Sequence, residues 1–378
     1  MYQMPLPADI TKMTDEQAAE RIHEIRRLLG ERLVILGHHY QRDDVIQFAD
    51  FRGDSLKLSQ LAAEQTEADY IVFCGVHFMA ESADILTSDR QIVLLPDMTA
   101  GCSMSDMAEI DQVEDAWAAL SGHFEDMSQV VPVTYVNSSA AIKNFTGRNG
   151  GVCCTSSNCR AIFEAVWAQK PDARIFFLPD EHLGRNTAYA MGVSLETMPV
   201  YDPFEIDGGL QVEDFQRSRL ILWKGFCSVH GEFTVEQIEK VRAADPPVRV
   251  VVHPECTFDV VQAADDSGST SRIVKVIGQA EPGSSWAVGT EINLVKRLGD
   301  QMREKGIHVR SLSGKACPCS TMYRIDLPHL VWIMEKVLQH SQDPTVKLSN
   351  QIRVDAQTRE GAMLALNRMM EISARAAV

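Results

Sequence analysis

One pattern recurs three times along the chain and constrains the fold more than any other feature. In each copy an apolar, strand-like segment ends in a polar cluster, as in VILGHHYQ, VPVTYVNSS and VRVVVHPEC. A turn rich in Gly, Ser and Thr then opens a helical stretch, as in RGDSLKL, CTSSNCR and SGSTSRI. A second apolar segment follows, and each copy then reaches a cysteine among small residues. Such self-similarity predicts three equivalent units stacked together.

The cysteines of the three copies suggest a single metal centre. They are Cys102, Cys227 and, in the third copy, Cys317 or Cys319, between which the repeat does not choose. Paired CxxC knuckles, the usual structural zinc ligands, do not occur in the required arrangement. Three thiolates would leave one position open, either on a catalytic zinc ion or on one iron of a cubane iron–sulfur cluster. The ordinary alternative is that a cysteine is a buried apolar residue, which is our expectation for Cys74.

Composition and charge narrow the class of protein. A formal net charge of -16 without a sustained Lys/Arg run argues against nucleic acid or an anionic membrane as partner, because both need a basic surface. The N-terminal segment lacks a signal-peptide pattern, and no apolar stretch is long enough to span a bilayer. We therefore expect a cytoplasmic protein whose thiols bind metal, take part in catalysis or lie buried, and do not form disulfides.

Short apolar runs alternate with helical patterns, which indicates an α/β fold built from βαβ units with parallel sheets. We predict three similar αβα units, which span residues 1–125, 126–240 and 241–378, with an insertion near 191–216 in the second. Periodicity predicts helices at residues 14–30 (with Asp15 as a possible N-cap), 56–67, 113–120, 160–169, 235–243, 288–304 and 354–373. In parallel sheets ligands bind beyond the carboxyl ends of the strands, where the polar clusters fall.

The polar clusters hold the candidate catalytic groups. His38 and His253 stand at equivalent positions in two copies, and the clusters also contain Tyr40, Tyr135, Asn137 and Glu255. These are acid–base and hydrogen-bonding types suited to proton transfers around a small polar substrate. The turns contribute Ser55, Ser156 and Ser269, which are either ordinary N-caps or part of three helix N-termini that bind carboxylates or a phosphate. No GxxxxGK[ST] or GxGxxG occurs in the right context for a nucleotide site.

Ten motifs in order resemble those of the quinolinate synthase family, in its longer form, over nearly the whole chain. They are GDSLKL, FCGVHFMAE, TAGCSMSDM, YVNSSA, CTSSN, FLPDEHLGRN, WKGFCSVHGEF, VVHPEC, GSTSRI and GTEINLV. The resemblance implies three αβα units around a pseudo-threefold axis, with one central active site and a 4Fe-4S cluster that has three cysteine ligands and one open iron. It further implies an enzyme of NAD biosynthesis that condenses iminoaspartate with dihydroxyacetone phosphate to quinolinate, phosphate and two waters. Functional coupling to an aspartate-oxidising enzyme is then expected.

The resemblance also assigns residues. The implied cluster ligands are Cys102, Cys227 and Cys319. Cys319 is chosen because the family has a cysteine three residues before a methionine, which here is Met322. Cys317 is the alternative third ligand. The implied catalytic residues are His38, Tyr40, His253 and Glu255. The implied substrate-binding residues are His38, Ser55, Tyr135, Asn137, Ser156, His253, Glu255, Ser269 and Thr270. His39 replaces a frequent Asn of the family motif, and we assign it no role.

We expect the open iron to act as a Lewis acid and not as an electron carrier. Glu255, backed by His253, is the expected proton-abstracting group, and Tyr40 with His38 is expected to handle the hydroxyl and keto groups of the triose. Two other classes would share some of these features. They are a zinc-dependent lyase or hydrolase with the same three thiolates, and an iron–sulfur sensor without catalytic activity.

Overall fold

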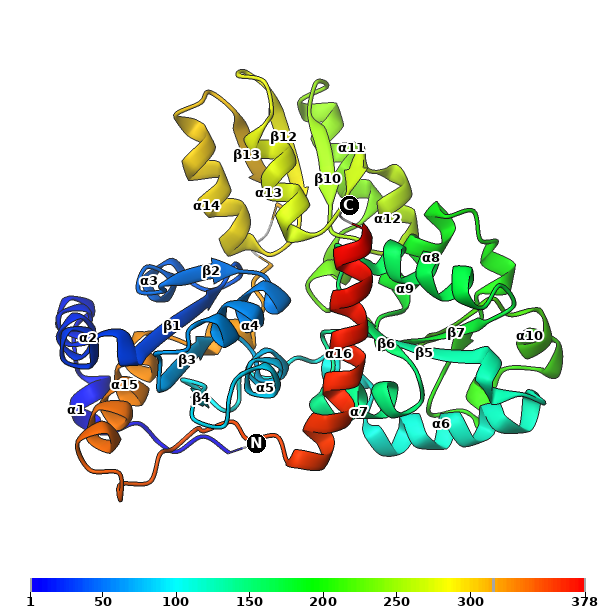
Figure 1. Ribbon diagram of the computed structural model, residues 1–378. Coiled ribbons are helices and arrows are strands. Elements are labelled where there is room, and N and C mark those ends of the chain that lie inside the picture. Colours follow the sequence, from blue (N-terminus) through cyan, green and yellow to red (C-terminus); the bar gives the residue numbers. More distant parts are fainter. Residues whose placement is uncertain (1, 315–316, 377–378) are drawn as a thin grey trace. The chain divides into compact units, whose positions relative to one another are not determined.

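The computed structural model describes residues 2–314 and 317–376, and within them three parallel β-sheets are flanked by helices (Figure 1). The first sheet holds β1 (Leu33–His38), β2 (Phe51–Gly53), β3 (Tyr70–Cys74) and β4 (Ile92–Leu94). The second holds β5 (Val130–Tyr135), β6 (Val152–Cys154), β7 (Arg174–Leu178), β8 (Val200–Tyr201) and β9 (Leu220–Trp223). The third holds β10 (Arg249–Val252), β11 (Asp266–Ser267), β12 (Ser285–Gly289) and β13 (His308–Ser311). The predicted α/β class with parallel sheets is confirmed.

The three sheets repeat one strand order. The orders are β2-β1-β3-β4, β6-β5-β7-β9-β8 and β11-β10-β12-β13, so the first strand of every sheet has a neighbour on each side. The chain leaves this strand in one direction and later returns to its other side, which makes its carboxyl end a topological switch point. The segment near 191–216, predicted as an insertion, adds the short edge strand β8 to the second sheet.

Helices connect the strands and cover both faces of the sheets. In the first part of the chain they are α1 (Ala8–Thr11), α2 (Asp15–Leu29), α3 (Asp43–Ile46), α4 (Ser55–Glu64), α5 (His77–Leu86), α6 (Ile110–His123), α7 (Ala140–Arg148) and α8 (Cys159–Gln169). They continue with α9 (Glu181–Ala190), α10 (Val212–Arg217), α11 (Val235–Ala244), α12 (Phe258–Ala263), α13 (Thr270–Gly278), α14 (Ile292–Arg303), α15 (Leu327–Gln342) and α16 (Ala356–Ala376).

Two helix predictions need correction. The N-cap of α2 is Thr14 and not Asp15, because the Thr14 hydroxyl accepts a bond from the Gln17 amide at 3.3 Å while the Gln17 side chain accepts one from the Thr14 amide at 2.9 Å. The helix predicted over 288–304 begins only at Ile292, since residues 288 and 289 end β12.

The chain forms two compact units. One comprises Met1–Cys102 and Pro318–Asp355 and contains the first sheet; the other comprises Ser103–Cys317 and Ala356–Val378 and contains the second and third sheets. Within the first unit α15 packs against α2, and within the second α16 packs against α7 and α8. The division into three αβα units stays a prediction, although each predicted range holds one sheet.

The first sheet shows why these strands form. Leu33 and Ile35 of β1 belong to the apolar cluster that includes α2 and α15, while Val34 and Leu36 belong to the cluster beneath α4 and α5. Successive side chains of a strand point to opposite faces, so a strand covered on both faces must be apolar throughout. Every residue of β1, including His38, is buried.

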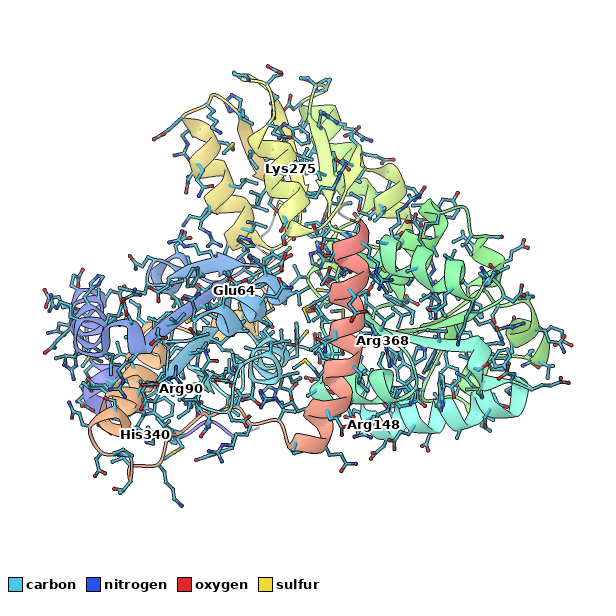
Figure 2. All side chains as sticks on the ribbon, in the orientation of Figure 1. Glu64, Arg90, Arg148, Lys275, His340 and Arg368 are labelled. Carbon is cyan, nitrogen blue, oxygen red and sulfur yellow. The ribbon has the colours of Figure 1, made fainter. Side chains whose placement is uncertain are left out.

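The contact between α7 and α16 depends on two glycines. A Cβ on Gly147 would lie 1.9 Å from the carbonyl oxygen of Gly361, and a Cβ on Gly361 would lie 2.0 Å from the side-chain oxygen of Asn144. Arg368 of α16 donates to the carbonyl oxygens of Gly147 at 3.0 Å and Gly151 at 2.6 Å. Figure 2 labels Arg368 on α16 and Arg148 on the neighbouring helix α7.

Gly147→Ala is therefore expected to destabilise the protein by about 1–3 kcal/mol, since the added methyl group must push the two helix backbones apart. Urea unfolding followed by circular dichroism measures this. The matched control is Gly122→Ala in α6, where a Cβ meets nothing within 4 Å, and helix propensity predicts a small gain in stability. Equal stability of Gly147→Ala and the parent protein would show that the close approach is not required.

Candidate functional site

The three polar clusters occupy the same place in the three sheets. Strand pairing sets His38 beside Gly53, Tyr135 beside Cys154 and Val252 beside Ser267, and His253 is the residue directly after Val252. His38, Tyr135 and His253 are therefore structural equivalents at the ends of the first strands. The residues two positions later are Tyr40, Asn137 and Glu255. The predicted groups thus follow the switch point of each sheet, where α/β proteins bind ligands.

The turns that follow these strands start helices in two of the sheets in the same way. After Gly53 and Gly268, the side chains of Asp54 and Ser269 cap α4 and α13 by accepting bonds from the amides of Lys57 at 3.0 Å and Arg272 at 3.3 Å. The next residues, Ser55 and Thr270, are the first residues of these helices and are buried. Ser156, two residues after Cys154, is their counterpart in the second sheet. Ser269, which the repeat pattern aligns with Ser55 and Ser156, is the N-cap of α13, and Thr270 follows it as the first helical residue, as Ser55 follows Asp54.

In the second unit a buried polar network surrounds Glu255. One carboxylate oxygen of Glu255 lies 2.9 Å from Nδ1 of His230, and the Tyr135 hydroxyl also bonds to this carboxylate. Nε2 of His230 lies 3.0 Å from the Thr290 hydroxyl. The ring of His253 stacks on that of His230, with centroids 4.4 Å apart and planes at 16°. All five side chains are buried, so water contributes little to holding the carboxylate.

The protonation states follow from these contacts. Burial raises the pKa of Glu255, but the imidazoles of His253 and His230 and the hydrogen bonds from His230 and Tyr135 together outweigh burial and lower the pKa to about 2. The ionised carboxylate only accepts, so His230 must donate from Nδ1. Its Nε2 then accepts from the Thr290 hydroxyl when the ring is neutral. The network holds Glu255 as a carboxylate with a fixed orientation.

His253 is held as a neutral ring. Burial lowers its pKa to about 3, and its Nδ1 accepts a bond from the Glu255 amide at 3.4 Å. The proton of the neutral ring is therefore on Nε2. His38 repeats this local geometry, because its Nδ1 accepts from the Tyr40 amide at 3.1 Å. The two equivalent histidines can each present an Nε2 proton to a substrate oxygen.

Sequence reasoning missed three residues of this region. His230 lies within the Cys227 motif and Thr290 within GTEINLV, and neither residue recurs in the other copies. Asp180, in FLPDEHLGRN, is a second buried acid; its carboxylate caps α9 by accepting from the Leu183 amide at 2.6 Å. Burial, followed by the charge of Glu255, raises the pKa of Asp180 well above its usual range. Two carboxyl groups with opposite pKa shifts are the pattern expected of an acid and a base.

Burial separates the cysteines into two groups. Five are buried, namely Cys74, Cys153, Cys154, Cys159 and Cys256, whereas Cys102, Cys227, Cys317 and Cys319 are half-buried. Burial raises the pKa of Cys74 and Cys153 to about 12 and those of Cys154 and Cys256 well above the usual range. Burial therefore favours the protonated thiol at these four positions. The residues predicted to hold a cluster are all in the more accessible group.

The first unit holds two of these cysteines, which contact the same apolar cluster. Cys102 and Cys319 both pack against the apolar cluster beneath α4 and α5, as does Tyr40. Cys227 lies in the second unit, where its thiol, a ring nitrogen of His230 and a carboxylate oxygen of Glu255 lie within 4.8 Å of one another. Such a group could take a divalent ion, but His230 already has Glu255 and Thr290 as hydrogen-bond partners.

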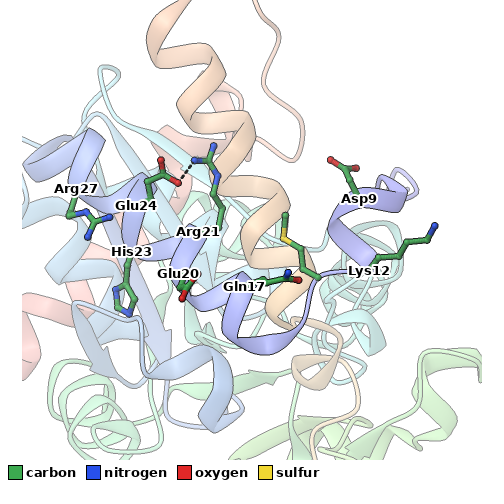
Figure 3. Close-up of a pocket in the computed structure, with 9 residues that line it drawn as sticks. Asp9, Lys12, Gln17, Glu20, Arg21, His23, Glu24 and Arg27 are labelled. Carbon is green, nitrogen blue, oxygen red and sulfur yellow. Dashed lines mark hydrogen bonds and ion pairs between the residues drawn. The ribbon is translucent and has the colours of Figure 1, made fainter.

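A separate hollow of about 850 Å³ lies beside α1 and α2 in the first unit (Figure 3). It is lined by charged and polar side chains of both signs, including Arg21 and Glu24, which are paired at 2.6 Å. None of the predicted site residues lines it, so we assign it no part in the chemistry.

Among the residues that the structure describes, no helix has the length and apolar character needed to cross a bilayer.

Comparison with known proteins gives one consistent result. The sequence model of the family described as quinolinate synthetase A protein matches residues 20–371. A quinolinate synthase of Anoxybacillus flavithermus is 55% identical over 366 residues, which cover 97% of this chain and 96% of the relative. A quinolinate synthase of Geobacillus thermodenitrificans is 52% identical over 370 residues, covering 97% of each chain. One of Bacillus cereus is 51% identical over 370 residues, covering 97% of this chain and 96% of the relative.

Proposed function

Because the chain belongs to the quinolinate synthase family, an enzyme family of NAD biosynthesis, we propose that it condenses iminoaspartate with dihydroxyacetone phosphate to quinolinate. Phosphate and two waters leave, and the atoms balance without any oxidant or reductant. An enzyme that oxidises aspartate would supply the imine, and we place both steps in the cytoplasm. The three sheets would stand around a pseudo-threefold axis, so that their first-strand ends share one active site.

We propose that Cys102, Cys227 and Cys319 hold a 4Fe-4S cluster with one iron lacking a protein ligand. The donor set fits, because these thiols are half-buried while the thiols with strongly raised pKa values lie elsewhere. When bound, the cluster supplies a Lewis acid for loss of a hydroxyl group. The shared packing of Cys102 and Cys319 against one apolar cluster supports Cys319 over Cys317.

The protein's own residues would bind and orient the substrates. The N-termini of α4 and α13, which carry Ser55 and Thr270, would offer amide protons to carboxylates and phosphate, and Ser156 would add a hydroxyl from the turn before α8. Asn137, Tyr135 and Ser269 would add hydrogen bonds at the same strand ends. Holding both substrates converts a bimolecular condensation into an oriented one.

Proton transfers would centre on Glu255, whose buried and doubly hydrogen-bonded carboxylate is the observation that carries this proposal. It would remove a proton from the condensing carbon skeleton while His253 donates from Nε2 to a substrate oxygen. His38 and Tyr40 would act on the hydroxyl and keto groups of the triose. The test is an anaerobic assay with iminoaspartate and dihydroxyacetone phosphate, in which quinolinate and phosphate should form in equal amounts. No quinolinate from protein with a full cluster would refute the proposal.

The His230 contact predicts a graded effect on turnover. His230→Ala should lower kcat about 10- to 100-fold, because the buried carboxylate loses one of its donors. His230→Asn, whose amide can replace the Nδ1 donor, should recover part of the loss. His308→Ala is the control, since His308 is an exposed histidine of the same unit. Steady-state kinetics with a cluster content equal to wild type measures the effect, and unchanged kcat in His230→Ala would contradict it.

A further inference from the structure

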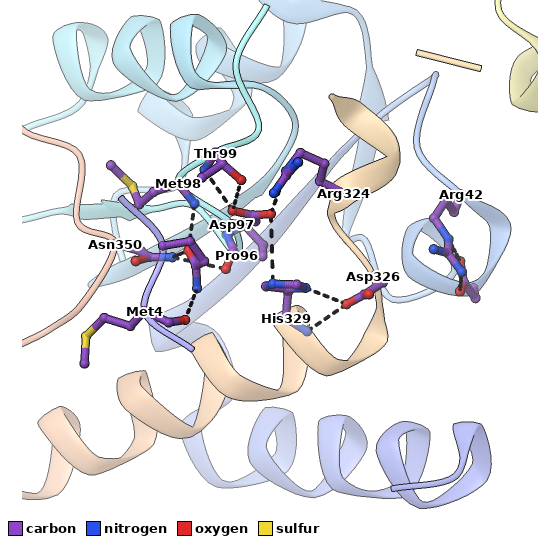
Figure 4. A network of polar contacts seen from close by, with 12 residues as sticks. Met4, Arg42, Pro96, Asp97, Met98, Thr99, Arg324, Asp326, His329 and Asn350 are labelled. Atoms are coloured by element: carbon purple, nitrogen blue, oxygen red, sulfur yellow. Dashed lines mark hydrogen bonds and ion pairs between the residues drawn. The ribbon is translucent and has the colours of Figure 1, made fainter. Parts of the chain in front are cut away.

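The side chain of Asp97 is almost completely buried in the first unit, yet it carries a polar network of its own (Figure 4). One carboxylate oxygen accepts from the Thr99 amide at 2.8 Å and from the Thr99 hydroxyl at 2.7 Å. The other lies 3.2 Å from Nε of Arg324 and 3.9 Å from Nε2 of His329. A carboxylate in such a place needs these donors, because burial without them is costly.

This network joins two turns that are far apart in sequence. On one side, the bonds to Thr99 close the turn that leads directly to Cys102, in which the Ala100 amide also donates to the Asp97 carbonyl at 3.1 Å. On the other side, Arg324 follows the turn that begins at Cys319. That turn is closed by the Tyr323 amide, which donates to the Cys319 carbonyl at 2.9 Å. The Asp97–Arg324 pair therefore connects the backbones that carry two of the proposed cluster ligands.

His329 adds a second connection to the same point. Its Nδ1 lies 2.7 Å from a carboxylate oxygen of Asp326, the N-cap of α15, while its Nε2 faces Asp97. The start of α15 is thus tied to the Cys102 turn. Arg42, shortly after the His38–Tyr40 turn, stacks over the Tyr323 ring at 4.5 Å from its centroid.

From this geometry we propose that Asp97, Arg324 and His329 are positioning residues that hold the Cys102 and Cys319 turns at the spacing a bound cluster requires. The inference rests on the proposed function, because it assumes that these two cysteines are ligands. Residues that orient metal ligands typically change metal affinity about 10- to 100-fold when they are replaced. Loss of the network should therefore accelerate loss of iron before it affects the fold.

The experiment compares cluster retention in Asp97→Asn and Arg324→Gln with that of the wild-type protein. All are reconstituted anaerobically, and iron release to a chelator is followed through the visible absorbance. We expect both variants to lose iron about 10- to 100-fold faster, and the electron paramagnetic resonance signal of the reduced cluster to broaden. Arg324→Lys, which keeps the charge, should recover part of the retention.

Matched controls come from a similar ion pair in the same unit, in which Nε of Arg32 lies 2.7 Å from Asp69. Asp69→Asn and Arg32→Gln should release iron as slowly as the wild-type protein. Thermal unfolding of the apoproteins shows whether a variant is misfolded or has only lost the positioning contact. The Arg324 side chain is 52% exposed, so Arg324→Gln is expected to fold. It therefore tests the inference even if Asp97→Asn does not fold. Unchanged iron release and an unchanged resonance signal in Arg324→Gln would overturn the inference. A wild-type protein that binds no cluster would instead refute the proposed function.

Discussion

Replacement of Glu255 by Gln is expected to lower kcat about 10²- to 10⁴-fold, the usual contribution of a general acid or base. The amide has the shape of the carboxylate but cannot take up the substrate proton. Because the pKa of Glu255 is low, the group is ionised throughout the physiological range and meets the substrate as a carboxylate. The cluster should remain, since Glu255 is not one of the proposed ligands.

The measurement is the steady-state rate of quinolinate formation by anaerobic protein over a range of substrate concentrations, with iron content determined on the same sample. Glu232→Gln is the matched control, because Glu232 is an exposed glutamate that follows the His230 turn. Substrate binding should survive in Glu255→Gln, so that the loss falls on kcat and not on KM. Near-normal turnover would remove Glu255 from the role of base.

Replacement of Cys102, Cys227 or Cys319 by Ser is expected to abolish both the cluster and the activity, because a serine hydroxyl does not replace a soft thiolate ligand. Cys317→Ser should keep both, although this residue is also half-buried and lies next to the same turn. Iron and acid-labile sulfide per protein, together with the visible spectrum, measure the cluster directly.

This series of variants decides among the possible ligand sets. Cys256→Ser serves as a second control, since Cys256 is buried with a raised pKa. If Cys317→Ser loses the cluster and Cys319→Ser retains it, the third ligand is Cys317. If Cys102→Ser keeps a full cluster and full activity, the three-thiolate proposal is wrong.

Periodicity predicted the elements well where a single pattern dominated. The helix predicted over 235–243 is found at Val235–Ala244, and that predicted over 160–169 at Cys159–Gln169. The prediction over 288–304 was wrong at its start because the apolar Val288 suits a strand as well as a helix, and only pairing with β10 decides. Thr14 and Asp15 are both competent caps, so the sequence could not choose between them.

The candidate site was predictable where its residues repeat. His38 and Tyr135 are the last residues of apolar strands and His253 directly follows one, so the three lie at corresponding strand ends. Thr270 and Ser269 could not be ranked from sequence, because equivalence at a turn depends on the register of two strands. His230 and Thr290 occur in one copy only, and their contacts with Glu255 arise from tertiary packing.

The most direct test of the central claim is the Mössbauer spectrum of the anaerobic protein before and after addition of iminoaspartate and dihydroxyacetone phosphate. We predict a 4Fe-4S cluster in which one iron site differs from the other three and changes when the substrates are added, because that iron has no cysteine ligand. Four irons that stay equivalent with and without the substrates, or protein that binds zinc and no iron, would contradict it.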